Sequence, residues 1–106
     1  MSLDLFFEED TTSLYNEKVD AETRKRIRVS IAACAYEVFD TSIISDSEFD
    51  ELAKSIDLSI NTRRPDLDQW FRKNFDPSTG MWIRSHPEFK RLQQLTLYLI
   101  RKDILK

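Results

Sequence analysis

Residues 36–52 read YEVFDTSIISDSEFDEL, the stretch with the clearest helix-loop-helix punctuation in the chain. Ser45 and Glu48 have the spacing of a capping box, in which the serine hydroxyl accepts from the backbone N–H three residues on and the glutamate side chain accepts from the serine N–H. Ile44 and Phe49 flank the box at the spacing of a hydrophobic staple. We therefore expect one helix to end before this loop and a second to begin at Ser45. The apolar face of the second helix should consist of Phe49, Leu52, Ala53 and Ile56.

A long helix is predicted before this loop. The sequence from Asp20 to Phe39 contains no glycine or proline, and Asp20 is a favourable N-cap residue. Helical spacing predicts a buried stripe, which consists of Ile27, Ile31, Cys34, Ala35 and Val38. On that stripe, Cys34 is expected to be a small core residue and not a nucleophile.

Residues 1–19 hold no sustained hydrophobic period. They contain an apolar cluster and then an acidic run, namely Leu3, Leu5, Phe6 and Phe7 followed by Glu8, Glu9 and Asp10. We expect a short, irregular N-terminal arm that lays its aromatic side chains on the core. The alternative is an acidic-hydrophobic segment that docks onto a partner.

A third helix is predicted to begin at Pro65, because proline suits the first turn of a helix, and to continue to about Phe75. The side chains expected to face inward are Leu67, Trp70, Phe71 and Phe75. Residues 76–80 read DPSTG, the strongest turn sequence in the chain, with the sole glycine free to take a positive φ.

The short apolar run after this turn, residues 81–83, is expected to be extended or irregular. The last helix should begin at Ser85 or His86, with Ser85 and Glu88 as a second capping box. His86 near this start is expected to be a capping residue and not a general base. The apolar face of the last helix should consist of Phe89, Leu92, Leu95, Thr96, Leu99 and Ile100.

The composition indicates an all-α protein. One glycine and three prolines in 106 residues argue against a β architecture, because hairpins and barrel corners use glycine repeatedly. Hydrophobic residues at 41% and charged residues at 33% suit one globular domain with a modest core. We predict a small single domain of about four helices over residues 1–106, with residues 1–19 as the arm. The lone cysteine and the lack of a signal peptide or an apolar membrane span predict a cytoplasmic location.

The helix-loop-helix stretch also resembles a known family. Residues 36–40 read YEVFD and residues 44–52 read ISDSEFDEL, with a loop of matching length between them. They follow the pattern Y-H-V-x-D-x-P-x-I-S-D-x-E-Y-D-x-L, which is typical of the small amino-terminal helical region of NAD-dependent DNA ligases. In that family the region closes over the nicotinamide mononucleotide half of NAD during self-adenylation. The resemblance covers about a fifth of the chain.

The resemblance implies that Tyr36, Asp46 and Asp50 are ligand-binding positions. Two other positions differ, because Glu37 stands where the family has a histidine and Phe49 stands where it has a second tyrosine. A carboxylate beside a phosphate is repulsive, and the absent phenol removes a hydrogen-bonding group. We expect the helical pair to have kept its scaffold and to have lost useful binding of nicotinamide mononucleotide.

Sequence motifs for catalysis are missing. The only glycine, Gly80, follows Pro77-Ser78-Thr79, so the Lys-x-Asp-Gly motif of adenylating ligases is absent, as are glycine-rich phosphate loops. One histidine and one cysteine do not make a usual zinc site. Asp46 and Asp50, one helical turn apart, could hold a metal ion, but an acidic first turn that stabilises the helix dipole is the simpler interpretation. No catalytic residue, metal or cofactor is predicted.

Clustered basic residues offer a possible surface for nucleic acid, namely Arg24, Lys25, Arg28, Arg63, Arg64, Arg72 and Lys73. The net charge of −3 lacks the basic excess that phosphate binding favours, and core aromatics with an exposed basic face explain the pattern as well.

Our leading interpretation is a non-enzymatic helical interaction or accessory module, of the kind that a phage or mobile element could encode. It predicts a protein partner or self-association and no membrane partner. One alternative is a module that binds a nucleotide similar to nicotinamide mononucleotide. The second alternative is a weak nucleic-acid-binding protein.

Overall fold

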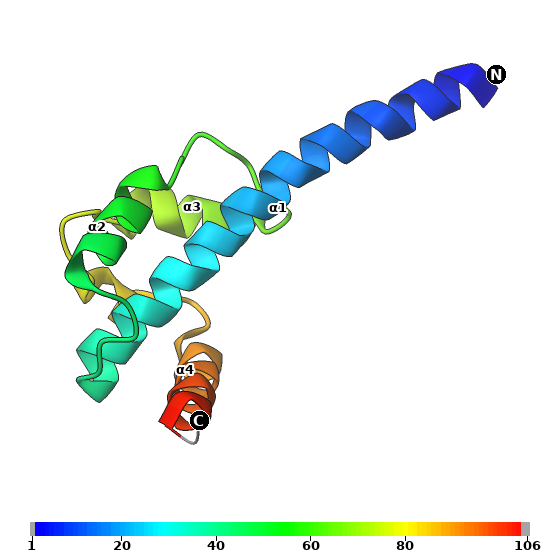
Figure 1. The fold of residues 1–106 in the computed structure, drawn as a ribbon. Coiled ribbons are helices and arrows are strands. Elements are labelled where there is room, and N and C mark those ends of the chain that lie inside the picture. Colours follow the sequence, from blue (N-terminus) through cyan, green and yellow to red (C-terminus); the bar gives the residue numbers. More distant parts are fainter. Residues whose placement is uncertain (1, 105–106) are drawn as a thin grey trace.

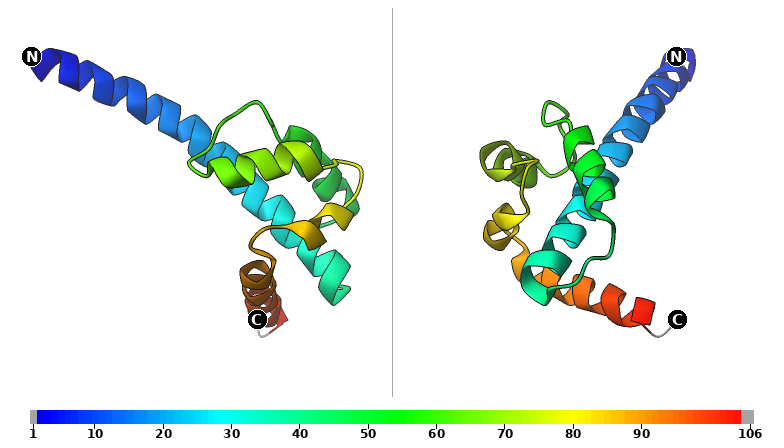
Figure 2. Two further views of the ribbon diagram at one scale, coloured as in Figure 1. Left: turned by 180° about the vertical axis from the view of Figure 1, so that it is seen from behind. Right: turned by 60° about the vertical axis from the view of Figure 1, so that its left-hand side comes forward.

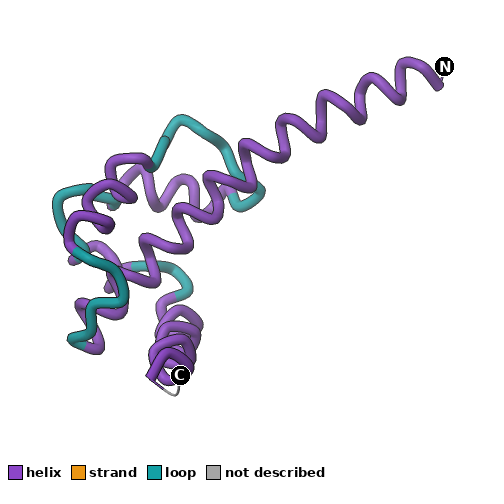
Figure 3. Tube along the Cα trace, viewed as in Figure 1, coloured by secondary structure: helices purple, strands orange, loops and turns teal. Residues whose placement is uncertain are grey.

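The computed structural model describes the backbone of residues 2–104 and the side chains of residues 17–102. The fold is all-α, as predicted, and these residues contain no strand (Figures 1 and 3). The elements are α1 (Ser2–Phe39), α2 (Asp46–Ser55), α3 (Pro65–Asn74), a 3₁₀ helix η1 (Met81–Ser85) and α4 (Phe89–Ile104). Helix α1 is the axis of the fold: α2, α3 and η1 lie on one side of it, and α4 crosses it on another (Figures 1 and 2).

Helix α1 begins at Ser2, which corrects the predicted start at Asp20. Asp20 lies within this helix and not at its cap; its carboxylate pairs with the guanidinium of Arg63, and Val19 before it is buried. The N-terminal part of α1 projects from the globule as an arm (Figure 1), and its backbone is helical where an irregular arm was expected. The predicted packing of the arm's aromatic residues concerns side chains before residue 17, outside the described ones.

The buried surface of α1 includes most of the predicted stripe and extends beyond it. Ile31, Cys34 and Ala35 are buried and Val38 packs against the core, as expected, whereas Ile27 is 47% exposed. Burial also reaches residues outside the predicted stripe, namely Val19, Glu22, Arg26, Val29, Ser30, Ala32 and Ala33. Periodicity does not predict the burial of Glu22 and Arg26, because charged residues are seldom buried unless they are paired.

Helix α2 begins as the sequence predicts. The backbone N–H of Glu48 donates to Ser45 Oγ at 3.1 Å, and the Ser45 N–H donates to Glu48 Oε1 at 3.0 Å, so the capping box is complete. The hydrogen bond from the Ser45 backbone N–H, together with the Ser45 side chain, lowers the pKa of the Glu48 carboxyl below its ordinary value. Ala53 is buried, and Phe49, Leu52 and Ile56 pack against the core, which confirms the predicted apolar face.

We expect Ser45→Ala to reduce the free energy of unfolding by about 1 kcal/mol, because the Glu48 N–H loses its side-chain acceptor. Urea denaturation followed by circular dichroism measures this loss. Ser47→Ala is the control, because Ser47 is exposed in the same helix and is not its cap. A Ser45→Ala protein as stable as the control would contradict a stabilising role for the box.

Helix α3 begins at Pro65 and is followed by Phe75, close to the predicted bounds. Phe71 is the centre of an aromatic cluster: its ring lies 5.0 Å from Trp70, 5.8 Å from Phe75 and 5.9 Å from Trp82, measured between centroids. Phe71 is buried, and Trp70 and Phe75 pack against the core, as expected. The cluster fastens α3 to η1, because Trp82 belongs to η1.

The turn at residues 76–80 forms where the sequence places it, but its glycine has another reason. Gly80 has φ −105°, not the positive value expected. A Cβ atom at Gly80 would lie 3.2 Å from Cβ of Ala33, so glycine allows the turn to approach α1 closely. The apolar run after the turn is a 3₁₀ helix in which Trp82 and Ile83 are buried, where an extended or irregular segment was expected.

Helix α4 begins at Phe89, later than predicted, and Ser85 forms no capping box. The Ser85 hydroxyl donates to the carbonyl of Trp82, and the backbone N–H of Glu88 donates to Nδ1 of His86 at 3.0 Å. His86 therefore supplies the acceptor at this helix start. On the apolar face of α4, Leu92, Thr96 and Ile100 are buried, but Leu95 and Leu99 remain exposed.

His86 makes the fold sensitive to mild acid. Burial lowers the pKa of His86 below its model-peptide value of 6.5, although Glu88 opposes this effect, and its Nδ1 must stay deprotonated to accept from the Glu88 N–H. The unfolded chain then binds the proton more readily than the folded one. This contribution to stability is complete above about pH 6.5 and is lost as the pH falls through the folded pKa.

We expect the wild type to lose stability as the pH falls below about 6.5 toward the folded pKa of His86, and His86→Asn to lose less, because asparagine offers an acceptor oxygen but does not titrate there. Urea denaturation at a series of pH values measures both slopes. Equal slopes for the two proteins would contradict a half-buried, neutral His86.

Candidate functional site

The predicted ligand-binding residues line one cleft. Tyr36 at the end of α1 and Asp46 and Asp50 on the first turns of α2 border a concavity of about 330 Å³. Its walls come from α1, from the loop at residues 42–44, from α2 and from the turn at residues 77–80. We call this concavity the α1–α2 cleft. The helix-loop-helix geometry brings the three residues together, because the short loop folds the start of α2 back beside the end of α1.

The two positions that differ from the ligase pattern also border the α1–α2 cleft. Glu37 and Phe49 are both among its lining residues. Phe49 is half-buried and packs against the core, so its ring is also part of the scaffold. Substitutions at these two positions therefore change the chemistry of the cleft itself and not of a distant surface.

The electrostatic character of the α1–α2 cleft is acidic. Three carboxylates border it, from Glu37, Asp46 and Asp50, and none of its described lining residues is a lysine or arginine. Asp50 forms an ion pair with Lys54 on the next turn of α2, with Oδ2 3.0 Å from Nζ. Tyr36 is exposed and adds an aromatic face. Such a site attracts a cationic group and repels a phosphate.

The far wall of the α1–α2 cleft is a turn that sequence reasoning did not connect with it. Gly80 allows residues 77–80 to lie against Ala33 of α1, and the Asp76 side chain shapes this turn by accepting from the Ser78 N–H at 2.9 Å. Arg84 in η1 donates to the carbonyl of Glu37, which ties the end of α1 to the same segment. No local pattern in the sequence indicates this contact, because it joins residues more than forty positions apart.

A buried ionic cluster holds α1, α3 and the segment between α2 and α3 together. Arg26 Nε lies 2.8 Å from Glu22 Oε2, and Arg26 Nη1 lies 2.8 Å from Asp68 Oδ1. The same guanidinium donates to the carbonyls of Asp57 and Ile60. All three charged side chains are buried. This cluster is structural, because the Arg26 guanidinium donates hydrogen bonds to four acceptors of the chain itself.

The basic residues considered for nucleic acid are divided among several contacts. Lys25 donates to the carbonyl of Ser55, Arg63 pairs with Asp20, Arg64 pairs with Asp66 and Glu88, and Arg72 donates to Leu58 O and Asn61 Oδ1. Arg24, Arg28 and Lys73 are exposed. Four of the seven candidates thus form hydrogen bonds or ion pairs within the chain, which leaves fewer of their N–H groups to bind a phosphate backbone.

The remaining candidate chemistry is limited. Cys34 is fully buried, and this burial raises the pKa of its thiol, in accord with a core residue. Among the described side chains, no group of three or more His, Cys, Asp or Glu residues is arranged to hold a metal ion. Within the described part of the chain, none of the helices combines the length and apolar character that a bilayer crossing requires.

The chain was compared with protein-family models, with curated proteins and with solved structures, and none of them matches it.

Proposed function

We propose that this protein is a non-enzymatic helical module that binds a positively charged side chain of a protein partner in the α1–α2 cleft. One observation carries the proposal: Tyr36, Glu37, Asp46 and Asp50 border the same concavity, whose described lining residues include no lysine or arginine. A lysine or arginine side chain entering there gains from carboxylates and from the face of a tyrosine ring.

The size of the cleft supports a side chain or a small ligand. Its volume of about 330 Å³ lies at the lower end of the range of small-molecule sites. The acidic residues lie on helices, at the C-terminal end of α1 and the N-terminal turns of α2, so their backbone positions are fixed before a ligand arrives. A preformed site of this kind loses little conformational entropy on binding.

The test uses an arginine-containing peptide as the probe in calorimetry, with the alanine version of the peptide as its control. We expect Asp46→Asn with Asp50→Asn to weaken peptide binding at least tenfold, because two of the three carboxylates lose their charge. Glu51→Gln is the matched control variant, since Glu51 is exposed on α2 but does not border the cleft. Equal losses in both variants would show nonspecific attraction to an acidic protein, and no binding by the wild type would refute the proposal.

A second candidate is the binding of nicotinamide mononucleotide. It is supported by the convergence of Tyr36, Asp46 and Asp50, the three positions that match the ligase pattern, on the same cleft. The nicotinamide ring of this ligand is cationic and suits the carboxylates, whereas its phosphate would meet Glu37. Nicotinamide riboside, which has the cationic ring without the phosphate, separates the two effects.

We expect the wild type to bind nicotinamide riboside more tightly than nicotinamide mononucleotide. Glu37→His with Phe49→Tyr restores the family residues and should reverse this order, because the imidazole removes the repulsion and the phenol adds a hydrogen-bonding group. Glu37→His alone tests the charge separately. Tight binding of the mononucleotide by the wild type would favour the second candidate over the first.

A further inference from the structure

A second concavity, of about 450 Å³, lies between α1, α3 and the start of α4. We call it the α4 groove. Its apolar lining consists of Ile27, Leu67, Phe71, Leu92 and Leu95. Phe71 and Leu92 are buried, whereas Ile27 is 47% exposed and Leu95 is 42% exposed. The groove thus combines buried apolar side chains with apolar side chains that remain in contact with water.

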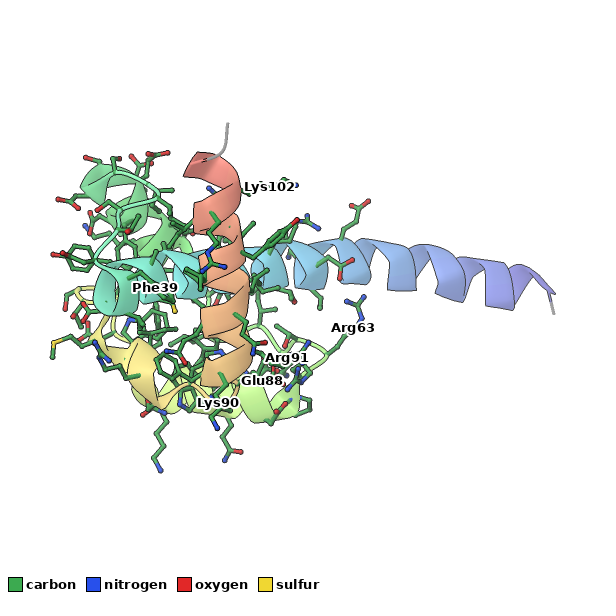
Figure 4. All side chains as sticks on the ribbon, turned by 90° about the horizontal axis from the view of Figure 1, so that it is seen from below. Phe39, Arg63, Glu88, Lys90, Arg91 and Lys102 are labelled. Carbon is green, nitrogen blue, oxygen red and sulfur yellow. The ribbon has the colours of Figure 1, made fainter. Side chains whose placement is uncertain are left out.

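The charged side chains that line the α4 groove are paired within the chain. The ion pairs are Arg26 with Glu22 and Asp68, Arg64 with Asp66 and Glu88, and Arg91 with Glu88. Figure 4 shows Glu88 and Arg91 together at the start of α4. Lys25 Nζ also lies 3.7 Å from Glu22 Oε1, so the cations and carboxylates of this network are equal in number. The groove therefore has no net charge with which to attract an anion or a cation.

The uncharged polar groups of the lining also have partners within the chain. The three hydroxyl groups donate as follows: Thr23 to the carbonyl of Val19, Ser30 to the carbonyl of Arg26 and Thr62 to the carboxylate of Asp68. His86 is neutral, and its Nδ1 accepts from the backbone N–H of Glu88. A ligand in this groove thus does not have to supply hydrogen bonds to these groups.

The base of the α4 groove is rigid before any ligand arrives. The Phe71 ring packs against the rings of Trp70, Phe75 and Trp82. The Arg26 guanidinium lies over the same ring and donates to four acceptors of the chain. A preformed site loses little conformational entropy on binding. The volume of the groove and its predominantly apolar lining are typical of small-molecule sites.

The geometry points to a binding site for a small, neutral and predominantly apolar molecule in the α4 groove. Such a molecule removes the exposed parts of Ile27 and Leu95 from water, which is favourable. A charged molecule loses its hydration there and finds no unpaired charge of opposite sign in return. The α4 groove is separate from the α1–α2 cleft, so this inference does not depend on the proposed function.

Protein NMR on the full chain tests the site with probes that have the same alkyl chain and different head groups, namely 1-octanol, octanoate and octylammonium. We expect octanol to shift the methyl resonances of Ile27 and Leu92 in a saturable manner. Octanol should bind at least fivefold more tightly than either charged probe at neutral pH. The absence of a saturable shift with octanol, or equally tight binding of a charged probe, would overturn the proposal.

Two groove variants, Ile27→Glu and Leu95→Glu, locate the bound octanol. Each places a carboxylate in the apolar lining and should weaken octanol binding at least tenfold. Tyr98→Glu is the matched control, because it adds the same charge at an exposed position of α4 outside the groove and should bind as the wild type does. Circular dichroism confirms that each variant is folded. An equal loss in the control would overturn the assignment.

Sedimentation equilibrium distinguishes this ligand from a second copy of the chain. We expect the wild type and both groove variants to sediment alike. Self-association of the wild type that Ile27→Glu and Leu95→Glu abolish would assign the groove to a contact between copies and would overturn the small-molecule proposal.

Discussion

Arg26→Ala should destabilise the fold by about 3–5 kcal/mol, because it leaves the buried carboxylates of Glu22 and Asp68 without their cation. The loss is a large fraction of the 5–15 kcal/mol that holds a typical domain together. Glu22 Oε1 is buried without a hydrogen bond and has Lys25 Nζ at 3.7 Å, so the Arg26 guanidinium is the closest cation to this carboxylate. The substitution also frees the carbonyls of Asp57 and Ile60, to which the guanidinium donates.

Urea denaturation followed by circular dichroism measures this effect. Arg24→Ala is the control, because Arg24 is exposed on the same helix, and its change should stay within about 0.5 kcal/mol. Arg26→Lys gives a finer test, since lysine keeps the charge but not the planar fork that serves four acceptors. If Arg26→Ala proved as mild as the control, the cluster would not stabilise the fold.

Phe71→Ala should cost about 3–5 kcal/mol through the lost transfer energy and the cavity left behind. Phe71 is 3% exposed, and its ring contacts those of Trp70, Phe75 and Trp82. The Arg26 guanidinium lies over the same ring, with Cζ 5.6 Å from its centroid. The substitution therefore weakens both contacts that hold α3 in place. These are the aromatic cluster and the packing around the ionic cluster.

The same denaturation experiment measures the loss in Phe71→Ala. Phe71→Leu should recover part of it, because leucine fills some of the cavity. Tyr98→Ala is the control, since Tyr98 is an exposed aromatic residue of α4 and its removal creates no buried cavity. Destabilisation of Phe71→Ala by less than about 1 kcal/mol would indicate that the surroundings collapse into the space and that α3 is held by other contacts.

The candidate site was predictable in part because its residues are close in sequence. Tyr36, Asp46 and Asp50 belong to a helix, a short loop and the next helix, and the capping box fixes where the second helix begins. Their convergence follows from that local geometry. The opposite wall did not follow from it, because two further helices separate Gly80 from Ala33 in the sequence.

The apolar face of α4 shows a different limit of prediction from helical spacing. Helical spacing groups Leu95 and Leu99 with Leu92 on one apolar face, but the structure buries Leu92 and leaves the other two exposed. Periodicity gives the face of a helix that is apolar. Periodicity does not show how much of that face another helix covers. The covered part depends on where α4 crosses α1.

The sequence by itself determined the all-α class, the start and apolar face of α2, the start of α3 at Pro65 and the turn before Gly80. These features depend on hydrogen bonds, ring constraints and spacing within a few residues. The tertiary structure extended the buried surface of α1 to Glu22 and Arg26, because these charged side chains are buried against Asp68 and the Asp57 and Ile60 carbonyls. The start of α1 also differs from the predicted cap, because the helix begins at Ser2 and Asp20 lies within it, where it pairs with Arg63 from a distant segment. Burial of charge needs partners from elsewhere in the chain, and no local pattern specifies them.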